Sequence, residues 1–391
     1  MRSSPAGARR ILFFPLGTVL GHFTRTLALA EELDAAGHEV VIAASNASRR
    51  IASVLPPRIR LVATREMYKR AAEHSGEIAH YSPGTANDRA NLEISSRMDR
   101  AEQRRRNQRM TQMMTSDAAI LSDVRPHAII TDYRFTVPLM RPAPAPIFHI
   151  SHILGFPSLH RRALGTVFFP LDRGHILVPG VRDIEYWRQR PPAPSAERCE
   201  TLCGAFRWRG WQRLQQTEPK RSPSDVFVFF GSTGNGAQIV PWLLRKIPDR
   251  YRVHCIASGL KAPAARKNVH IARSGPLDGF LENTQVAICH GGHGTVMECI
   301  RNRTPMIIFP HNLEQLEIGR RIEAMGLGVL VKRRFDQLGA NELSVIIART
   351  IADGRLRTNL EKYSAILRRS DGAKNAAETV LRHLDSGDHA S

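Results

Sequence analysis

The same order of predicted elements opens both halves of this 391-residue chain. In the first half, the apolar run Ile11 to Phe14 is followed by a loop with two glycines, Leu16 to Gly21. Apolar residues then recur at helical spacing over Phe23 to Ala36. Gly37 supplies a helix stop, and Glu39 to Ala44 is a second apolar run. Strand, Gly-containing loop, helix and strand in this order are typical of the start of a doubly wound α/β domain.

The pattern begins again near residue 225. Val226 to Phe230 is a predicted strand, Gly231 to Gly234 a loop, and Gln238 to Lys246 a helix. Further strands are predicted at Tyr251 to Ala257, Val286 to Cys289, Met306 to Phe309 and Gly328 to Val331. We therefore predict an α/β fold of two Rossmann-like doubly wound domains facing across a cleft, residues 1–204 and 225–391, joined by a linker over residues 205–224. The chain is expected to be helical from Arg355 to Leu384, and the last helix could pack back on the first domain.

The rest of the first domain is less regular. Ala128 to Thr131, which leads to Asp132, and Ile147 to Ile150 are predicted strands. Residues 65–123 are polar and largely helical, with the Arg-rich stretch Asp99 to Arg109. Residues 151–204, rich in Pro, Arg and aromatics, are expected to form an irregular rim around a binding cleft.

The chain carries 56 Lys and Arg against 36 Asp and Glu, a formal net charge of +20. This excess favours an anionic partner such as a nucleotide, a phosphorylated acceptor or an acidic membrane surface, although a solvated basic surface would give the same count. No basic run is interleaved with aromatic residues, which argues against a nucleic-acid-binding module.

Compartment and membrane contact are constrained by the cysteines and by the apolar runs. Five cysteines, an odd number scattered along a long chain, are typical of reduced cytoplasmic thiols. The apolar start at Ile11 to Leu20 is interrupted by Pro15 and Gly17, so it is interpreted as a strand and not as a secretory signal. No run reaches the ~18 apolar residues of a spanning helix. We expect a cytoplasmic protein with at most peripheral membrane contact.

The densest group of reactive side chains is His290-Gly291-Gly292-His293-Gly294-Thr295, followed by Glu298. It follows a predicted buried strand and opens a helix. Glycines let a backbone approach a ligand closely, and the amides at a helix start attract an anion such as pyrophosphate. Glu298 lies one helical turn beyond Gly294, where it could accept hydrogen bonds from ribose hydroxyls. The alternative is an ordinary Gly-rich turn.

The segment from His290 to Gly326 resembles the donor-binding signature of the nucleotide-sugar-dependent glycosyltransferases of GT-B fold, family 1. Its elements are His290 to Glu298, Pro305 to Pro310, Glu314-Gln315 and Gly326 to Gly328. Gly21-His22 and Gly231-Ser232 also fit the family pattern. The resemblance covers most of the second domain well, the first 45 residues fairly well, and the middle of the first domain poorly.

The resemblance implies a donor site for a UDP-sugar or, less favoured, a dTDP-sugar. His290, Gly292, Gly294 and Thr295 would hold the diphosphate, Glu298 would bind ribose, and Glu314 and Gln315 would meet the sugar hydroxyls. Ser232 would add a phosphate contact, and Gly21 and Thr233 complete the expected donor-binding set. The nucleotide sugar is a co-substrate, and no cofactor or metal is expected.

The same resemblance implies that His22 is the general base that deprotonates the acceptor hydroxyl, with Asp132 orienting its ring. Histidine titrates near neutrality, and a carboxylate behind the ring stabilises the imidazolium that forms. One-step displacement would invert the anomeric configuration. The acceptor is expected to be a small, natural-product-like molecule, and the Arg-rich segment suggests one that carries negative charge.

Three departures from the family pattern stand out. Arg25 occupies a position where many relatives have proline, Gly275 precedes Pro276 where many have an aromatic, and Glu314 replaces the usual aspartate. Two alternatives stay open: a nucleotide-sugar epimerase of the same fold, and a non-catalytic partner protein with the GT-B fold.

Overall fold

The computed structural model of the chain describes residues 7–16, 20–44, 55–65, 100–134, 136–140, 143–152, 174–185, 198–210, 224–231, 236–257, 266–272, 275–311, 313–333 and 335–386. The chain forms two compact units. Unit 1 comprises Met1–Lys69, Met98–Leu214 and Ser370–Ser391, and unit 2 comprises Arg70–Arg97 and Gln215–Arg369.

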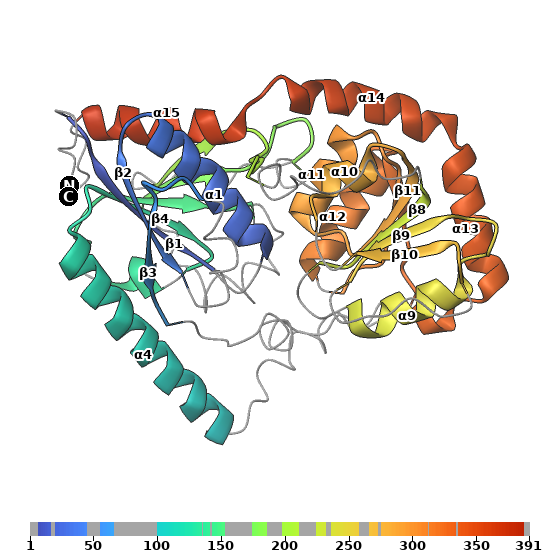
Figure 1. Ribbon diagram of the computed structural model, residues 1–391, viewed down its shortest axis with the longest axis horizontal. Helices are drawn as coiled ribbons and strands as arrows, with labels where there is room; N and C mark the ends of the chain where they lie inside the picture. Colours follow the sequence, from blue (N-terminus) through green and yellow to red (C-terminus); the bar gives the residue numbers. More distant parts are fainter. Residues whose placement is uncertain are drawn as a thin grey trace. The chain divides into compact units, whose positions relative to one another are not determined.

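Unit 1 is built on a seven-stranded sheet in the order β3-β2-β1-β4-β5-β6-β7, with every pair parallel (Figure 1). The strands are β1 (Arg10–Pro15), β2 (Glu39–Ala44), β3 (Arg60–Ala63), β4 (Ala128–Asp132), β5 (Ile147–Ile150), β6 (Gly174–Val178) and β7 (Arg198–Leu202). The central strands are mostly apolar because a parallel sheet is covered on both faces.

Alternate residues of β1, β2 and β4 face two separate cores, as the period of a strand requires. One core combines Ile11, Ile42 and Ile130 with helices α1 (Leu20–Ala35) and α15 (Gly372–Asp385). The other combines Leu12 and Ile129 with α4 (Arg100–Val124) and α5 (Thr136–Leu139). Helix α15 lies directly beside α1 (Figure 1), so the end of the chain completes the core of unit 1.

Three strands of this sheet were not predicted. The expectation that residues 151–204 are irregular was wrong for β6 and β7, which extend the sheet at one edge. β3, at the opposite edge, has no fully buried residue, and β7 has the polar sequence RCETL. Edge strands bury less of each face than central strands, so their apolar pattern is weak.

The stretch expected to be a linker begins with residues that pack on unit 1. Trp208 is buried in the core shared with α1 and α15, and its indole Nε1 donates to Glu31 Oε1 at 2.8 Å. Residues 211–223 of that stretch lie outside the described residues. Its last residue, Ser224, is the first residue of β8.

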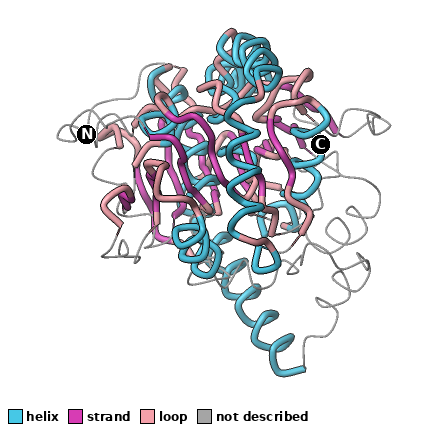
Figure 2. Tube along the Cα trace, turned by 90° about the vertical axis from the view of Figure 1, so that its right-hand side faces the viewer, coloured by secondary structure: helices cyan, strands magenta, loops and turns pink. Residues whose placement is uncertain are grey.

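Unit 2 has a six-stranded parallel sheet in the order β10-β9-β8-β11-β12-β13. Its strands are β8 (Ser224–Phe229), β9 (Val253–Ile256), β10 (Val269–Ala272), β11 (Thr284–Cys289), β12 (Met306–Ile308) and β13 (Gly328–Leu330). One face packs against α9 (Gly236–Lys246) and α13 (Ala340–Ala352). Phe227, on the other face, stacks on Phe280 of α10 (Leu277–Leu281). Figure 2 shows the strands in magenta with helices in cyan around them.

The remaining helices of unit 2 are α11 (His293–Arg301), α12 (Leu313–Ala324) and α14 (Gly354–Arg368), with a short 3-10 turn at Phe335–Gln337. The residues expected to be helical from Arg355 to Leu384 form two helices, α14 and α15. Asp371 caps α15 by accepting a hydrogen bond from the Lys374 amide. A Cβ on Gly372 would lie 2.0 Å from the Gly204 carbonyl oxygen, so this close approach requires glycine. Among the described residues, no helix combines the length and apolarity needed to cross a membrane.

Candidate active site

The strand order of unit 1 reverses between β1 and β4, which lie side by side at the centre of the sheet. Ligands of open α/β sheets bind at such a topological switch point, beyond the carboxyl ends of the strands. Helix α1 begins shortly after β1 and presents His22 in its first turn, and β4 ends at Asp132. Two of the predicted residues therefore come together at this edge because of the topology.

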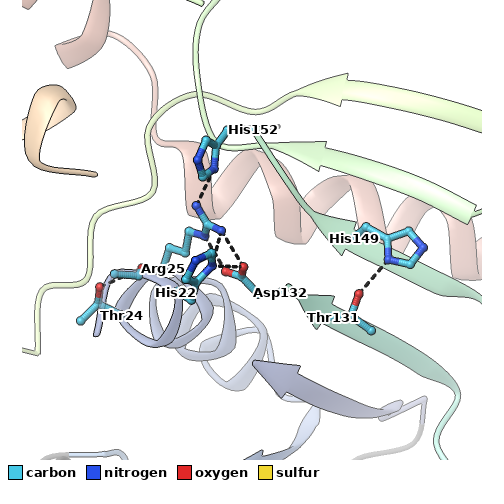
Figure 3. Close-up of polar contacts among 8 residues, drawn as sticks. His22, Thr24, Arg25, Thr131, Asp132, His149 and His152 are labelled. Atoms are coloured by element: carbon cyan, nitrogen blue, oxygen red, sulfur yellow. Dashed lines mark hydrogen bonds and ion pairs between the residues drawn. The ribbon is translucent and has the colours of Figure 1, made fainter. Parts of the chain in front are cut away.

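His22 and Asp132 are in direct contact (Figure 3). His22 Nδ1 lies 2.7 Å from Asp132 Oδ1, although the two residues are 110 positions apart in the sequence. The Asp132 side chain is fully buried, whereas 16% of the His22 side chain is exposed. Such an arrangement holds the imidazole in one orientation while leaving part of the ring accessible.

Arg25 joins this pair and was not among the predicted site residues. It lies three residues after His22, on the same face of α1. Its Nε donates to Asp132 Oδ2 at 2.5 Å and its Nη2 to Oδ1 at 2.6 Å, which is a bidentate pairing (Figure 3). Burial opposes ionisation of Asp132, but the charges of Arg25 and His22 outweigh it and hold the pKa of this carboxyl below its usual value.

Two further side chains border the cluster. His152, two residues beyond the end of β5, has its Nδ1 2.8 Å from Arg25 Nη1. Tyr133 follows Asp132 with a left-handed backbone, φ 59°, and the centroid of its ring lies 4.9 Å from that of His22. A bulky residue at positive φ is uncommon and costs free energy, so its place beside His22 points to a site. The signal for His152 in the sequence is its position just past a predicted strand.

Unit 2 has its own topological switch point between β8 and β11, where its strand order reverses. Gly231 follows β8 with φ 72°, and His290 follows β11. A Cβ on Gly231 would lie 3.3 Å from the His290 ring, and one on Gly292 would lie 2.5 Å from His290 Nε2. Burial lowers the pKa of His290 to about 4, so its imidazole is neutral at pH 7 and has a single N–H to donate.

Helix α11 starts at this loop, and its N-cap residue provides no side-chain hydrogen bond to the first amides. Gly292 is the N-cap, Gly291 before it has φ 81°, and Thr295 is buried in the first turn. Gly294 is exposed, and a Cβ built on it would meet no atom within 4 Å. An anion can therefore approach the backbone at Gly294 closely. Glu298 lies one turn further along the same helix and is half-buried.

Helix α12 of unit 2, which follows the loop after β12, carries Glu314 and Gln315 in its first turn. Gln315 is buried, and its Oε1 accepts a hydrogen bond from the His311 amide at 2.8 Å, so it holds the loop after β12. Glu314 is half-buried, and its charge acts on His290. Gly21 is exposed in unit 1. The predicted donor residues Ser232 and Thr233 lie outside the described residues.

Comparisons with known proteins agree with this architecture. Residues 258–376 match the family model of the erythromycin biosynthesis protein CIII-like C-terminal domain. Two solved structures align over nearly the whole chain at low sequence identity. The glycotransferase of kitacinnamycin gives a TM-score of 0.70 at 18% identity, covering 97% of this chain and 100% of its own. The glycosyltransferase SsfS6 of Streptomyces sp. SF2575, complexed with thymidine diphosphate, gives 0.65 at 19%, covering 96% and 99%.

The fold and the family model define the class of proteins that the chain resembles: it has the two parallel-sheet α/β units of the solved GT-B glycosyltransferases, and the larger part of its second half matches the erythromycin biosynthesis protein CIII-like C-terminal domain. Within that class it is 30% identical over 114 residues to demethyllactenocin mycarosyltransferase of Streptomyces fradiae, 29% of this chain. It is 34% identical over 105 residues to UDP-sugar-dependent glycosyltransferase 52 of Dictyostelium discoideum, 27% of this chain. These matches span 24% and 6% of the two relatives' own lengths.

Proposed function

We propose that this protein is an inverting glycosyltransferase that moves a hexose-type sugar from a UDP- or dTDP-sugar to a hydroxyl of a small-molecule acceptor. The observation that carries the proposal is the 2.7 Å contact between His22 Nδ1 and Asp132 Oδ1 at the switch point of unit 1. With Nδ1 directed at a carboxylate, Nε2 is the nitrogen that accepts the proton of the attacking hydroxyl.

The donor is held by unit 2 in this proposal. The diphosphate binds at the start of α11, where Gly294 leaves the helix amides open beside His290. These donors stabilise the negative charge that the leaving nucleoside diphosphate acquires, so the reaction proceeds without a metal. Glu298 binds ribose, Glu314 and Gln315 contact the sugar, and Ser232 and Thr233 complete the part of the donor site that unit 2 supplies.

The nucleotide part of the donor is supported by what related proteins bind. One solved neighbour was crystallised with thymidine diphosphate, and one curated relative is named for UDP-sugars. The acceptor is a natural-product-like molecule by analogy with the mycarosyltransferase of Streptomyces fradiae and the glycotransferase of kitacinnamycin.

The test is incubation of the purified protein with a panel of UDP- and dTDP-sugars, with and without a panel of phenol and alcohol acceptors. We expect slow donor hydrolysis alone, faster release of UDP or dTDP with an acceptor, and an inverted anomeric centre in the product by NMR. Free UDP or dTDP should also raise the melting temperature.

The same assay separates this function from its alternatives. An epimerase would change the sugar while keeping the nucleotide attached, so no free nucleotide diphosphate would accumulate. A non-catalytic protein would bind nucleotide, or fail to, with no turnover under any pairing. Either result would contradict the proposed transfer.

A further inference from the structure

Arg25 is the charged group that sets the proposed base of this protein apart from a simple His–Asp pair. Its guanidinium contacts three groups at once: both oxygens of Asp132, the Nδ1 of His22 at 2.6 Å and the Nδ1 of His152 at 2.8 Å. Only 11% of its side chain is exposed. The residues of this cluster come from α1, from the end of β4 and from the loop after β5 (Figure 3).

His22 Nδ1 contacts two partners that have opposite hydrogen-bonding roles and opposite charges. Asp132 Oδ1, at 2.7 Å, can only accept a hydrogen bond, and Arg25 Nη2, at 2.6 Å, can only donate one. Protonated Nδ1 satisfies Asp132 and faces the positive charge of Arg25. Unprotonated Nδ1 satisfies Arg25 and faces the negative charge of Asp132. The ring protonated on Nδ1, whose Nε2 is available to accept a proton, therefore gains less stabilisation than a lone carboxylate would give it.

The charges around the ring largely cancel. Among the described residues, the titratable groups against His22 are Asp132, Arg25 and the phenol of Tyr133, and His152 adjoins Arg25. One guanidinium bound to one carboxylate carries no net charge. The stabilisation that Asp132 would offer an imidazolium is thus offset by Arg25 at a similar distance.

We propose that Arg25 is a positioning residue that holds the Asp132 carboxylate and offsets its charge, so that His22 is suited to acceptors whose hydroxyl is acidic, such as phenols. This inference rests on the proposed function. When the protonated form of a base gains little stabilisation from its surroundings, the base is weak, and proton transfer to it then depends more on the acidity of the acceptor hydroxyl. A phenol, with a pKa of about 10, is far more acidic than an aliphatic alcohol.

The first experiment compares acceptors of similar shape and different acidity. Transfer from the active nucleotide sugar is measured to 4-methylphenol and to 4-methylcyclohexanol, as a function of pH. Wild type should prefer the phenol. Arg25→Gln keeps a donor for Asp132 without the charge, so the acidic limb of its pH–rate profile should move about 1 pH unit higher. Its preference for the phenol should fall several-fold. Arg25→Lys keeps the charge and should stay close to wild type in both measurements.

A second experiment needs no turnover. The His22 ring is followed by NMR as pH is varied in the intact protein, its signal being assigned by its loss in His22→Gln. The ring should titrate about 1 pH unit higher in Arg25→Gln than in wild type, and near wild type in Arg25→Lys. Arg209→Gln, which removes an exposed partner of Asp371, is the control and should leave the titration unchanged.

The outcomes separate the two proposals. If no donor and acceptor pair gives transfer but the NMR shift is present, the proposed function fails and the role of Arg25 in charge balance stands. If wild type transfers sugar and Arg25→Gln keeps both the same titration and the same acceptor preference, the inference about Arg25 is overturned. Melting curves and circular dichroism establish that each variant is folded.

Discussion

Of the two ring nitrogens of His22, Nδ1 lies between Asp132 and Arg25, which leaves Nε2 to meet an acceptor. His22→Ala should therefore lower turnover by ~10²–10⁴-fold, the usual contribution of a general base. Binding of UDP or dTDP should stay close to wild type because these ligands are assigned to unit 2. Steady-state kinetics and calorimetry check both parts.

A matched histidine in unit 1 provides the control. His127 accepts a hydrogen bond from the Arg10 amide at 2.9 Å, away from the switch point, so His127→Ala should leave turnover near wild type. Turnover of His22→Ala within a few-fold of wild type would remove His22 from the mechanism.

Asp132 is expected to contribute both to the proposed mechanism and to the stability of unit 1. Asp132→Asn should cut turnover and also lower the free energy of unfolding at pH 7 by about 3–5 kcal/mol, because Arg25 would keep a buried charge without its carboxylate. The pKa of Asp132 is lowered in the folded state, so its stabilisation is complete above the unfolded pKa of about 3.9 and is lost as pH falls through the lower folded pKa.

The penalty of Asp132→Asn should therefore be constant from pH 7 down to about 5 and shrink below about pH 4. Urea unfolding at several pH values measures it, with the exposed Asp123→Asn on α4 as the control. A penalty that stays the same down to pH 3 would mean that the carboxylate gains nothing from its partners.

At the scale of elements, a substitution at the start of α11 is predicted to weaken nucleotide binding without lowering the stability of the fold. Gly294→Ala adds a methyl group into open space, and alanine is the better helix former by about 1 kcal/mol. The melting temperature should stay the same or rise. The same methyl group would stand where the diphosphate is proposed to approach, so the affinity for UDP or dTDP should fall by about tenfold or more.

Gly354, the first residue of α14, offers the matched control, since a Cβ built there also meets no atom within 4 Å. Gly354→Ala should leave nucleotide affinity unchanged. Unaltered affinity in Gly294→Ala as well would show that the diphosphate does not approach this helix start.

Much of both sheets could be predicted because their central strands are nearly continuous apolar runs, such as Ile11 to Phe14 and Val286 to Cys289. The edge strands β3 and β7, and β6 next to β7, could not, because polar residues interrupt their apolar pattern. The pairing of His22 with Asp132 was implied by the family resemblance, and the position of Asp132 at the end of a predicted strand selected it as the matching aspartate. The part played by Arg25 could not be predicted, because sequence spacing gives the face of a helix but not which carboxylate its side chain reaches.

For the whole molecule, the net charge of +20 exceeds what one nucleotide diphosphate requires. Part of the excess lies on the N-terminal half of α4, where Arg104 and Arg105 are exposed, and the side chain of Arg106 lies outside the described residues. This half of the helix belongs to unit 1, which also carries the proposed base. We therefore predict an acceptor that is negatively charged or presented at an anionic surface.

Attraction of this kind is screened over a Debye length of about 8 Å at physiological salt. The KM for the acceptor should rise steeply with salt, while the KM for the donor, held by helix-start amides, should rise less. Replacing Arg104, Arg105 and Arg106 with Gln should flatten the salt dependence of the acceptor KM. Replacing the exposed Arg349, Arg355 and Arg357 of unit 2 removes the same charge elsewhere and should not. If both triple variants behaved alike, or if a neutral acceptor were used equally well at all salt concentrations, the basic surface of α4 would have no part in recognising the acceptor.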